Sequence, residues 1–237
     1  STGDGVYKST DGGATWTRLG LRDGQQIPNI AVDPRNADRL FVAVQGHPYG
    51  PNEERGVFRS IDGGKTFQKV LYKSPNIGAA DVDIDPTNSN IVYATLWDER
   101  HGFAENVAFR GDKGGIYKST DGGETWAQSG NGMRNAYMPP EKAYDPAVQD
   151  VHRMAACAAD PDVVWVQHHN GIFRSTDGAA TFKEIKKVSP STFGFVVAAH
   201  PTDSKTAWFV PGVQDVQRIP VDGRLVVTRT RDGGRTF

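Results

Sequence analysis

The chain alternates short apolar runs with polar turns, and this alternation recurs along all 237 residues. The apolar runs are strand-length, rich in β-branched and aromatic residues, and bounded by Gly, Pro, Asp and Asn, which favours strands over helices. The expected runs form two sets, 29–32, 80–84, 154–158 and 195–199, and 40–44, 91–96, 163–167 and 207–210. The pattern therefore predicts an all-β protein.

A turn of the form Ser/Thr-x-Asp-Gly-x-x-Thr-Trp/Phe marks each repeat. Its aspartates are Asp11, Asp62, Asp121, Asp177 and Asp232. Their spacing of about 55 residues suits a four-stranded propeller blade with loops. The glycines allow the positive φ of a tight hairpin, and the aspartate can accept hydrogen bonds from backbone N–H groups of the turn. We therefore expect each aspartate to accept hydrogen bonds within its own turn.

A second turn signal falls between the first ones, at Asp33-Pro34, Asp85-Pro86, Asp160-Pro161 and, with a substitution, His200-Pro201. Proline fixes φ and the neighbouring short polar side chains bond the local backbone, so each pair predicts a turn between two strands. A complete unit is then strand A, the Asp-Pro turn, strand B, a variable loop, strand C, the Asp-Gly turn and strand D. The units span about 1–22, 28–73, 79–129, 150–187 and 194–237.

At these residues the chain resembles the Asp-box, or BNR-repeat, β-propellers. That superfamily includes sialidases, xyloglucan-degrading glycoside hydrolases, sortilin-type receptors and a photosystem II assembly factor. The first three units, with the loop 47–55, resemble large secreted bacterial BNR proteins, whereas the last two, with 165–170, resemble shorter sialidase-like ones. The change lies near 127–150, and both natural divergence and a junction would explain it.

The resemblance implies a β-propeller domain, or part of one, over residues 1–237, in a secreted or periplasmic protein. Three units are complete, the first holds only strands C and D, and the last stops before D. The chain starts at Ser1 and stops at Phe237 on the repeated turn, so we expect a segment of a propeller with six or seven blades. The resemblance also implies that the Asp boxes lie at the outer rim, so that their five aspartates are structural. It further implies that ligands bind at the mouth, where A strands start and B strands end.

Charge and composition limit the classes of partner that the chain can bind. Lys and Arg total 27, Asp and Glu total 28, and no basic stripe stands out, so we expect no nucleic-acid partner. The apolar runs are too short to span a membrane. The single cysteine, Cys157, excludes an internal disulfide and is expected in the core.

The mouth loops 45–55, 97–105, 150–153 and 167–170 carry most of the polar variation and five of the six histidines. The predicted ligand-binding residues are His47, Asp98, Arg100, His101, His152, Arg153, His168 and His169. Histidine is polar, titratable and able to ligate metals, although solvated loops also contain it. Neighbours His168 and His169 would point to opposite faces of a strand, so we expect no metal ion and no cofactor.

Three functions remain open: a module that binds a glycan or a protein segment, which we prefer, a glycoside hydrolase, and an assembly scaffold. A hydrolase usually needs two carboxyl groups about 5–9.5 Å apart. The mouth-loop candidates are Glu53, Glu54, Asp98, Glu99 and Glu105. Arg218-Ile219-Pro220 matches a sialidase triplet, but it lies outside the place where that family carries it. Tyr137 and Tyr144 fit a sialidase nucleophile only in being tyrosines.

Overall fold

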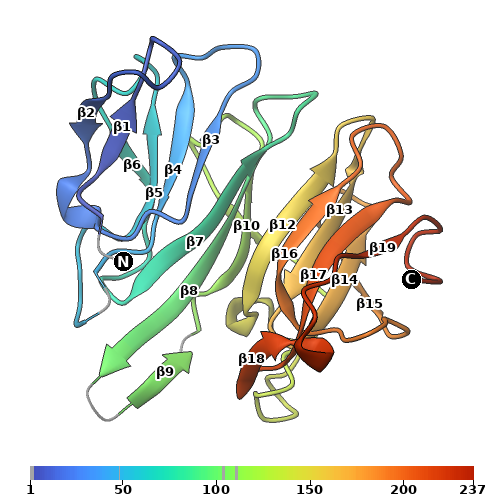
Figure 1. The fold of residues 1–237 in the computed structure, drawn as a ribbon. Helices are drawn as coiled ribbons and strands as arrows, with labels where there is room; N and C mark the ends of the chain where they lie inside the picture. Colours follow the sequence, from blue (N-terminus) through green and yellow to red (C-terminus); the bar gives the residue numbers. More distant parts are fainter. Residues whose placement is uncertain (1–2, 48, 103–104, 110–111) are drawn as a thin grey trace. The chain divides into compact units, whose positions relative to one another are not determined.

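The computed structural model describes residues 3–47, 49–102, 105–109 and 112–237, and the side chains of residues 99–111 lie outside the described part. The described part is nearly all β (Figure 1). Its strands are β1 (Val6–Lys8), β2 (Thr17–Gly20), β3 (Asn29–Val32), β4 (Leu40–Val44), β5 (Gly56–Ser60), β6 (Gln68–Leu71), β7 (Ile77–Ile84), β8 (Val92–Gly102), β9 (Glu105–Phe109), β10 (Gly115–Ser119), β11 (Ala127–Ser129), β12 (Val151–Cys157), β13 (Asp160–His168), β14 (Gly171–Ser175), β15 (Lys183–Ile185), β16 (Gly194–Ala199), β17 (Ala207–Gln214), β18 (Gln217–Pro220) and β19 (Thr228–Thr230). Three short 3-10 turns are η1 (Arg22–Gly24), η2 (Pro146–Val148) and η3 (Val221–Gly223).

The strands pair into successive antiparallel sheets. Two sheets are four-stranded in simple order, β3-β4-β5-β6 and β12-β13-β14-β15. A third has the order β7-β8-β10-β11 with β9 added to β8, and in the last β17 pairs with β16, β18 and β19. The pair β1-β2 forms a short sheet of its own. The predicted class, four-stranded antiparallel blades of a β-propeller, is confirmed.

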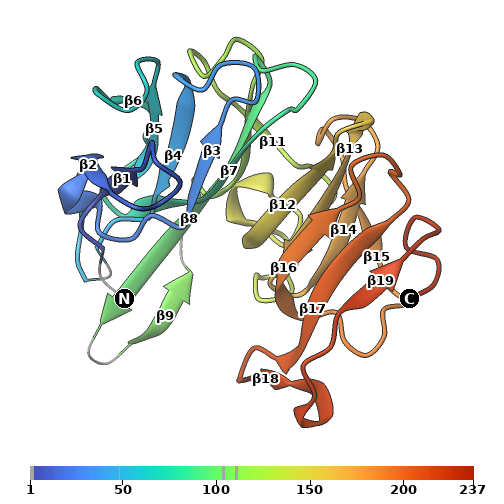
Figure 2. The same ribbon diagram turned by 45° about the horizontal axis from the view of Figure 1, so that its top comes forward.

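The chain divides into two compact units. The first comprises Ser1–Ile84, Asn88–Lys113 and Lys118–Ala127, and the second Asp85–Thr87, Gly114–Tyr117 and Gln128–Phe237. The main division between the two units falls at Ala127. Figure 2 gives a second view of the strands within each unit.

The core of the second unit lies between its two neighbouring sheets. Val163 and Trp165 of β13 and Ile172 of β14 pack against Val197 of β16 and Phe209 of β17. Every residue from 163 to 168 is buried. A strand with both faces covered has no solvent face, so its sequence is a continuous apolar run rather than an alternating one. Each such large apolar side chain contributes about 1.5–3 kcal/mol through burial.

The repeated turns close the C–D hairpins through the aspartate. In the second repeat, Asp62 Oδ1 accepts hydrogen bonds from Ser60 Oγ at 2.8 Å and Thr66 N at 2.9 Å, and Oδ2 accepts from Thr66 Oγ1 at 2.6 Å. Hydrogen bonds from Thr15 and Ser9 likewise lower the pKa of Asp11 to about 2. The following glycines, Gly63 and Gly64, have φ of 73° and 90°. These carboxylates therefore stabilise the turn.

Two details differ from the predictions. The stretch 97–105, expected as a loop, is partly strand, because β8 continues to Gly102 and its backbone pairs with β9. The Asp160-Pro161 pair, expected as a turn, begins β13, and the turn is formed two positions earlier by Ala158 and Ala159. Cys157 and Asp160 then face each other as the last pair of a tight hairpin.

His200 shows why a histidine can replace the aspartate of an Asp-Pro turn. Asp33 Oδ1 accepts a hydrogen bond from the backbone N–H two residues later, at 2.9 Å. His200 Nδ1 accepts the equivalent bond from Thr202 N at 3.1 Å, and a second from Asp203 N at 3.1 Å. The ring nitrogen takes the place of the carboxylate oxygen.

Candidate functional site

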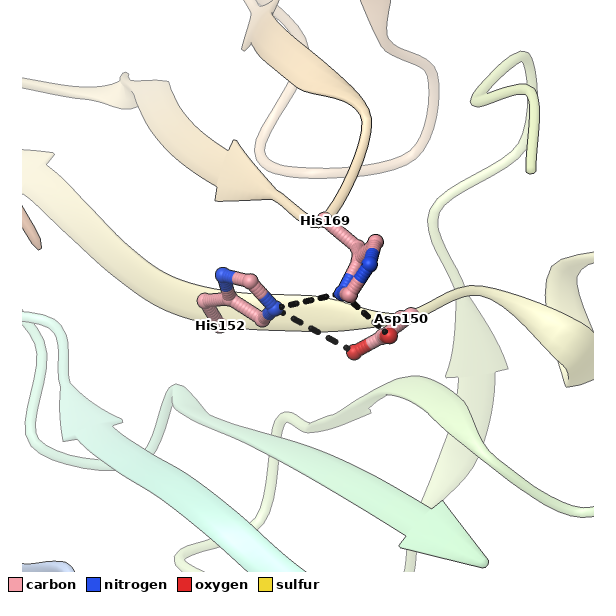
Figure 3. A group of neighbouring side chains, drawn as sticks. All are labelled: Asp150, His152 and His169. Carbon is pink, nitrogen blue, oxygen red and sulfur yellow. Dashed lines mark hydrogen bonds and ion pairs between the residues drawn. The ribbon is translucent and has the colours of Figure 1, made fainter. Parts of the chain in front are cut away.

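The candidate site lies in the second unit, where β12 begins and β13 ends. Asp150 precedes β12, His152 lies in β12, and His169 follows β13 directly (Figure 3). The register shifts between Val151 and Arg153, and such a bulge re-aims the side chain of the extra residue. His169 N donates to Asp150 O at 2.9 Å, which ties the two strand ends together.

Three side chains converge at this point. His169 Nδ1 lies 3.1 Å from Asp150 Oδ2 and 3.1 Å from His152 Nε2. His152 Nε2 lies 3.7 Å from Asp150 Oδ1. The exposed fractions are 5% for Asp150, 8% for His152 and 4% for His169, so the contacts are shielded from solvent. These three groups could hold a metal ion, since one ligand atom from each lies within 4.8 Å of the others.

A second ionic pair continues the cluster toward the surface. Asp215 Oδ1 lies 3.3 Å from His169 Nε2 and 2.6 Å from Arg218 Nη2. Both residues belong to the β17–β18 hairpin, Asp215 in its turn and Arg218 in β18. His169 is therefore held between two carboxylates, Asp150 on Nδ1 and Asp215 on Nε2.

Aromatic rings surround the two histidines. Phe195 stacks on His152 with ring centroids 4.5 Å apart and planes 10° apart, and the Arg218 guanidinium lies 5.5 Å from the Phe195 centroid. Tyr137 meets His169 edge-on at 4.9 Å. Tyr137 is 62% exposed and Phe195 is 42% exposed, so each offers an aromatic surface to solvent beside the buried ionic groups.

The pKa shifts follow from burial and from the two carboxylates. Burial lowers the pKa of His152 and outweighs the attraction of Asp150. Burial also acts to lower the pKa of His169, but the hydrogen bond and charge of Asp150, together with Asp215, outweigh it and the pKa is raised. For Asp215 burial acts to raise the pKa, and the contacts with Arg218 and His169 reverse it, so the pKa is lowered.

His168, predicted as a ligand contact, has a different setting. Its side chain is fully buried. Its Nε2 lies 3.1 Å from Gln149 Oε1, and its Nδ1 accepts a hydrogen bond from Asn170 N at 3.3 Å. Burial lowers the pKa of His168 to about 3, so the ring is neutral. His168 therefore stabilises the end of β13 through buried hydrogen bonds.

The other predicted residues are spread over the two units. His47 and Asp98 belong to the first unit, and Asp98 pairs with Ile77 between β7 and β8. The side chains of Arg100 and His101 lie outside the described part. Arg153 is half-buried in β12. Of the predicted set, the cluster in the second unit brings together His152 and His169.

Sequence reasoning missed several members of the cluster. Asp150 was noticed only as part of the loop 150–153, although its position before an A strand was a usable signal. Arg218 was set aside with the Arg-Ile-Pro triplet, yet its guanidinium pairs with Asp215 in the cluster. The sequence offers Tyr137 only as one of two tyrosines and Phe195 only as the start of the expected strand 195–199, because their approach to the histidines depends on pairing and bulges far along the chain.

Comparisons with known proteins agree with this architecture. The Sortilin-Vps10 family (sortilin, neurotensin receptor 3) matches residues 4–160. A xyloglucanase of Hypocrea jecorina (strain QM6a) is 27% identical over 217 residues, covering 80% of this chain and 24% of that protein. A xyloglucanase of a Paenibacillus species is 27% identical over 269 residues, covering 98% of this chain and 23% of that protein. The chain thus spans about a quarter of the length of these relatives.

Solved structures show the same fold. An ancestral GH74 enzyme superposes with a TM-score of 0.70 at 19% identity, over 98% of this chain and 27% of that one. The GH74 enzyme of Niastella koreensis gives a TM-score of 0.62 at 18% identity, over 99% of this chain and 42% of that one. In the described part, the helical turns are all too short to cross a membrane. Since the family match spans well over half of the sequence, this chain belongs to the Sortilin-Vps10 family of Asp-box propeller proteins.

Proposed function

We propose that this chain is part of a secreted or periplasmic propeller that binds a glycan at the cluster around His152 and His169. The observation that carries the proposal is the pairing of exposed aromatic rings, Tyr137 and Phe195, with the charged pair of Asp215 and Arg218. Binding sites for small ligands commonly combine aromatic walls with a few placed polar groups. The relatives named as xyloglucanases favour a glycan over a protein segment as the ligand.

The two rings give the test. Removing one aromatic contact costs about 0.5–1.5 kcal/mol, which corresponds to a loss of roughly 2–12-fold in affinity. We expect Tyr137→Ala and Phe195→Ala each to weaken binding of xyloglucan oligosaccharides, measured by calorimetry, by that factor. Tyr144→Ala is the matched control, because Tyr144 is a 60% exposed tyrosine of the same segment between β11 and β12. Equal affinity of all three variants and the unchanged protein would reject the cluster as the glycan site.

A protein ligand is the alternative occupant of the same surface. If a glycan array gave no hits and a pull-down recovered one dominant protein, the ligand would be a protein segment and not a glycan. If that recovery persists in Tyr137→Ala and Phe195→Ala, the propeller instead acts as an assembly scaffold through another face.

A second candidate function is glycoside hydrolysis, favoured by similarity to xyloglucanases over most of the chain. The cluster contains two carboxylates, Asp150 and Asp215, on opposite nitrogens of His169. The sequence also offers Asp98 and Glu105. Release of reducing ends from xyloglucan by the full-length parent protein would establish hydrolysis. Its loss in Asp98→Ala and Glu105→Ala, or in Asp150→Asn and Asp215→Asn, would then decide which pair is catalytic.

A further inference from the structure

The convergence of one carboxylate and two imidazoles has a chemistry of its own, separate from glycan binding. We propose that Asp150, His152 and His169 form a binding site for a divalent first-row transition-metal ion of the Zn²⁺ class. The two histidines come from different strands, His152 from β12 and His169 from the end of β13. The expectation of no metal rested on the opposed directions of the neighbours His168 and His169. Those two are not the pair that would share the ion.

The spacing of the ligand atoms fits a coordination sphere. Zinc binds histidine nitrogen and carboxylate oxygen at about 2.0–2.2 Å, so neighbouring ligand atoms around a tetrahedral ion are about 3.3–3.6 Å apart. Two edges of the triangle, His169 Nδ1 to His152 Nε2 and to Asp150 Oδ2, are 3.1 Å long. His152 Nε2 lies 3.7 Å from the other oxygen of that carboxylate, Asp150 Oδ1, so the two histidines face different oxygens of Asp150. One ligand atom from each residue lies within 4.8 Å of the others, so a modest movement of the side chains would complete the geometry.

Hydrogen bonding within the cluster fixes the tautomer of His152 and leaves one oxygen of Asp150 without a donor among the described residues. His152 Nδ1 lies 2.7 Å from the carbonyl oxygen of Gly194, which can only accept, so Nδ1 carries the proton and Nε2 presents a lone pair. Among the described residues, Asp150 Oδ1 is buried and accepts no hydrogen bond. A buried carboxylate oxygen without a donor is costly, and a cation bound between Asp150 and the two histidines would satisfy it.

Both histidines already have the outer partners that metal-binding histidines require. In metal sites the second ring nitrogen usually donates to a backbone carbonyl or a carboxylate, which fixes the tautomer and the ring orientation. His152 has the carbonyl of Gly194, and His169 has Asp215 at 3.3 Å from Nε2. Arg218 holds that carboxylate in turn, at 2.6 Å. These outer contacts thus hold the two rings so that His152 Nε2 and His169 Nδ1 lie close together, 3.1 Å apart.

The donor set indicates the class of ion. Imidazole nitrogen suits Zn²⁺ and its first-row neighbours, whereas Ca²⁺ and Mg²⁺ prefer sites made of oxygen. Three protein ligands leave at least one coordination position for water or another ligand, as in sites of the catalytic type. The site does not depend on glycan binding, so either property could be present without the other.

The direct test is a titration of the metal-stripped chain with Zn²⁺ alone, followed by calorimetry and by metal analysis after dialysis. We expect one Zn²⁺ per chain, and at least a hundredfold weaker binding in His152→Asn and His169→Gln. Asp215→Asn should weaken binding about tenfold while keeping one ion per chain, because it loosens His169 without removing a ligand. With Co²⁺ as the probe, a bound ion should give visible absorption that His152→Asn abolishes.

The matched control is His200→Asn, since His200 acts through Nδ1 as an acceptor in a turn and an asparagine oxygen can replace it. This variant should bind Zn²⁺ as the unchanged chain does. Circular dichroism and thermal unfolding of each variant separate loss of the site from loss of the fold. The proposal is overturned if the unchanged chain takes up no Zn²⁺, or if folded His152→Asn binds it as tightly as His200→Asn.

Discussion

The buried carboxylate of Asp33 offers a sharp test of how the first unit is held together. Asp33 sits in the turn between β3 and β4 and is 3% exposed. Its Oδ1 accepts hydrogen bonds from Arg35 N at 2.9 Å and Ser89 Oγ at 2.7 Å. Its Oδ2 lies 2.7 Å from Arg39 Nε and 2.6 Å from Arg39 Nη2. Since Ser89 belongs to the turn between β7 and β8, this carboxylate links two neighbouring sheets.

Asp33→Ala removes a buried carboxylate and, with it, the four contacts described above. Breaking a fully buried ion pair costs about 3–5 kcal/mol. Arg39 is 19% exposed and keeps a 2.8 Å hydrogen bond to Ser89 O, so we expect about 2–4 kcal/mol, measured by urea unfolding. Asp33→Asn should recover little of this loss, because its amide N–H groups would face the Arg39 donors. A double-mutant cycle with Ser89→Ala should give a coupling of about 0.5–3 kcal/mol.

The pH dependence of the same variant follows from the sign of the shift. Burial acts to raise the pKa of Asp33, but hydrogen bonds from Arg35, Ser89 and Arg39 outweigh it and the pKa is lowered. A carboxyl with a lowered folded-state pKa contributes stability above its unfolded pKa of about 3.9 and loses it as pH falls through the folded-state value. The gap between the unchanged chain and Asp33→Ala should therefore be full at pH 7 and narrow below about pH 4. The reasoning would be refuted if Asp33→Ala lowered the free energy of unfolding by less than about 1 kcal/mol at pH 7. It would also be refuted if the difference in the free energy of unfolding were the same at pH 3 as at pH 7.

Three further predictions concern the turns and the metal site. Gly56→Ala should destabilise the first unit by more than Gly50→Ala in thermal unfolding, because the added Cβ would lie 2.3 Å from Leu71 O at φ 118°, whereas at Gly50 it meets only open space at φ 74°. Asp11→Asn should leave stability at pH 2 nearly unchanged but lower it at pH 7, because hydrogen bonds from Thr15 lower the pKa of Asp11 to about 2 and its stabilising effect disappears as pH falls through that value. Zn²⁺ at a hundred times its Kd should stabilise the second unit by about 2.7 kcal/mol and raise the Tm of that unit, and His152→Asn should abolish the rise.

Much of the fold could be predicted from the sequence because its signals are local. Asn29–Val32 and Leu40–Val44 are strands with the expected bounds, since each is a short β-rich run that ends at a Pro turn or a polar loop. The stretch 97–105 escaped prediction for the opposite reason. Its charged residues resemble a loop, and their strand structure comes from backbone pairing with β9, a five-residue partner that the turn signals do not mark.

The candidate site was predictable only in part. The rule that A-strand starts meet B-strand ends correctly brings His152 near His169, although they are far from each other in the amino-acid sequence. It could not distinguish His169 from its neighbour His168. The residue at which β13 stops decides that His168 lies in the sheet and that His169 follows it. Nor could it find Asp215 and Phe195, which reach the cluster through the β17–β18 hairpin and through a register shift in β16.

Asp33 and Asp150 show how a structural carboxylate differs from a functional candidate. Both are buried, at 3% and 5% exposure, and both precede or follow a strand of a blade. Asp33 has two partners on each oxygen, so burial of its charge is fully compensated within the fold. Among the described residues, Asp150 Oδ1 receives no hydrogen bond. Well-packed apolar residues would stabilise the strand ends at least as well as an incompletely satisfied ionic cluster. The fold alone therefore does not explain Asp150, and a ligand at its unsatisfied oxygen would.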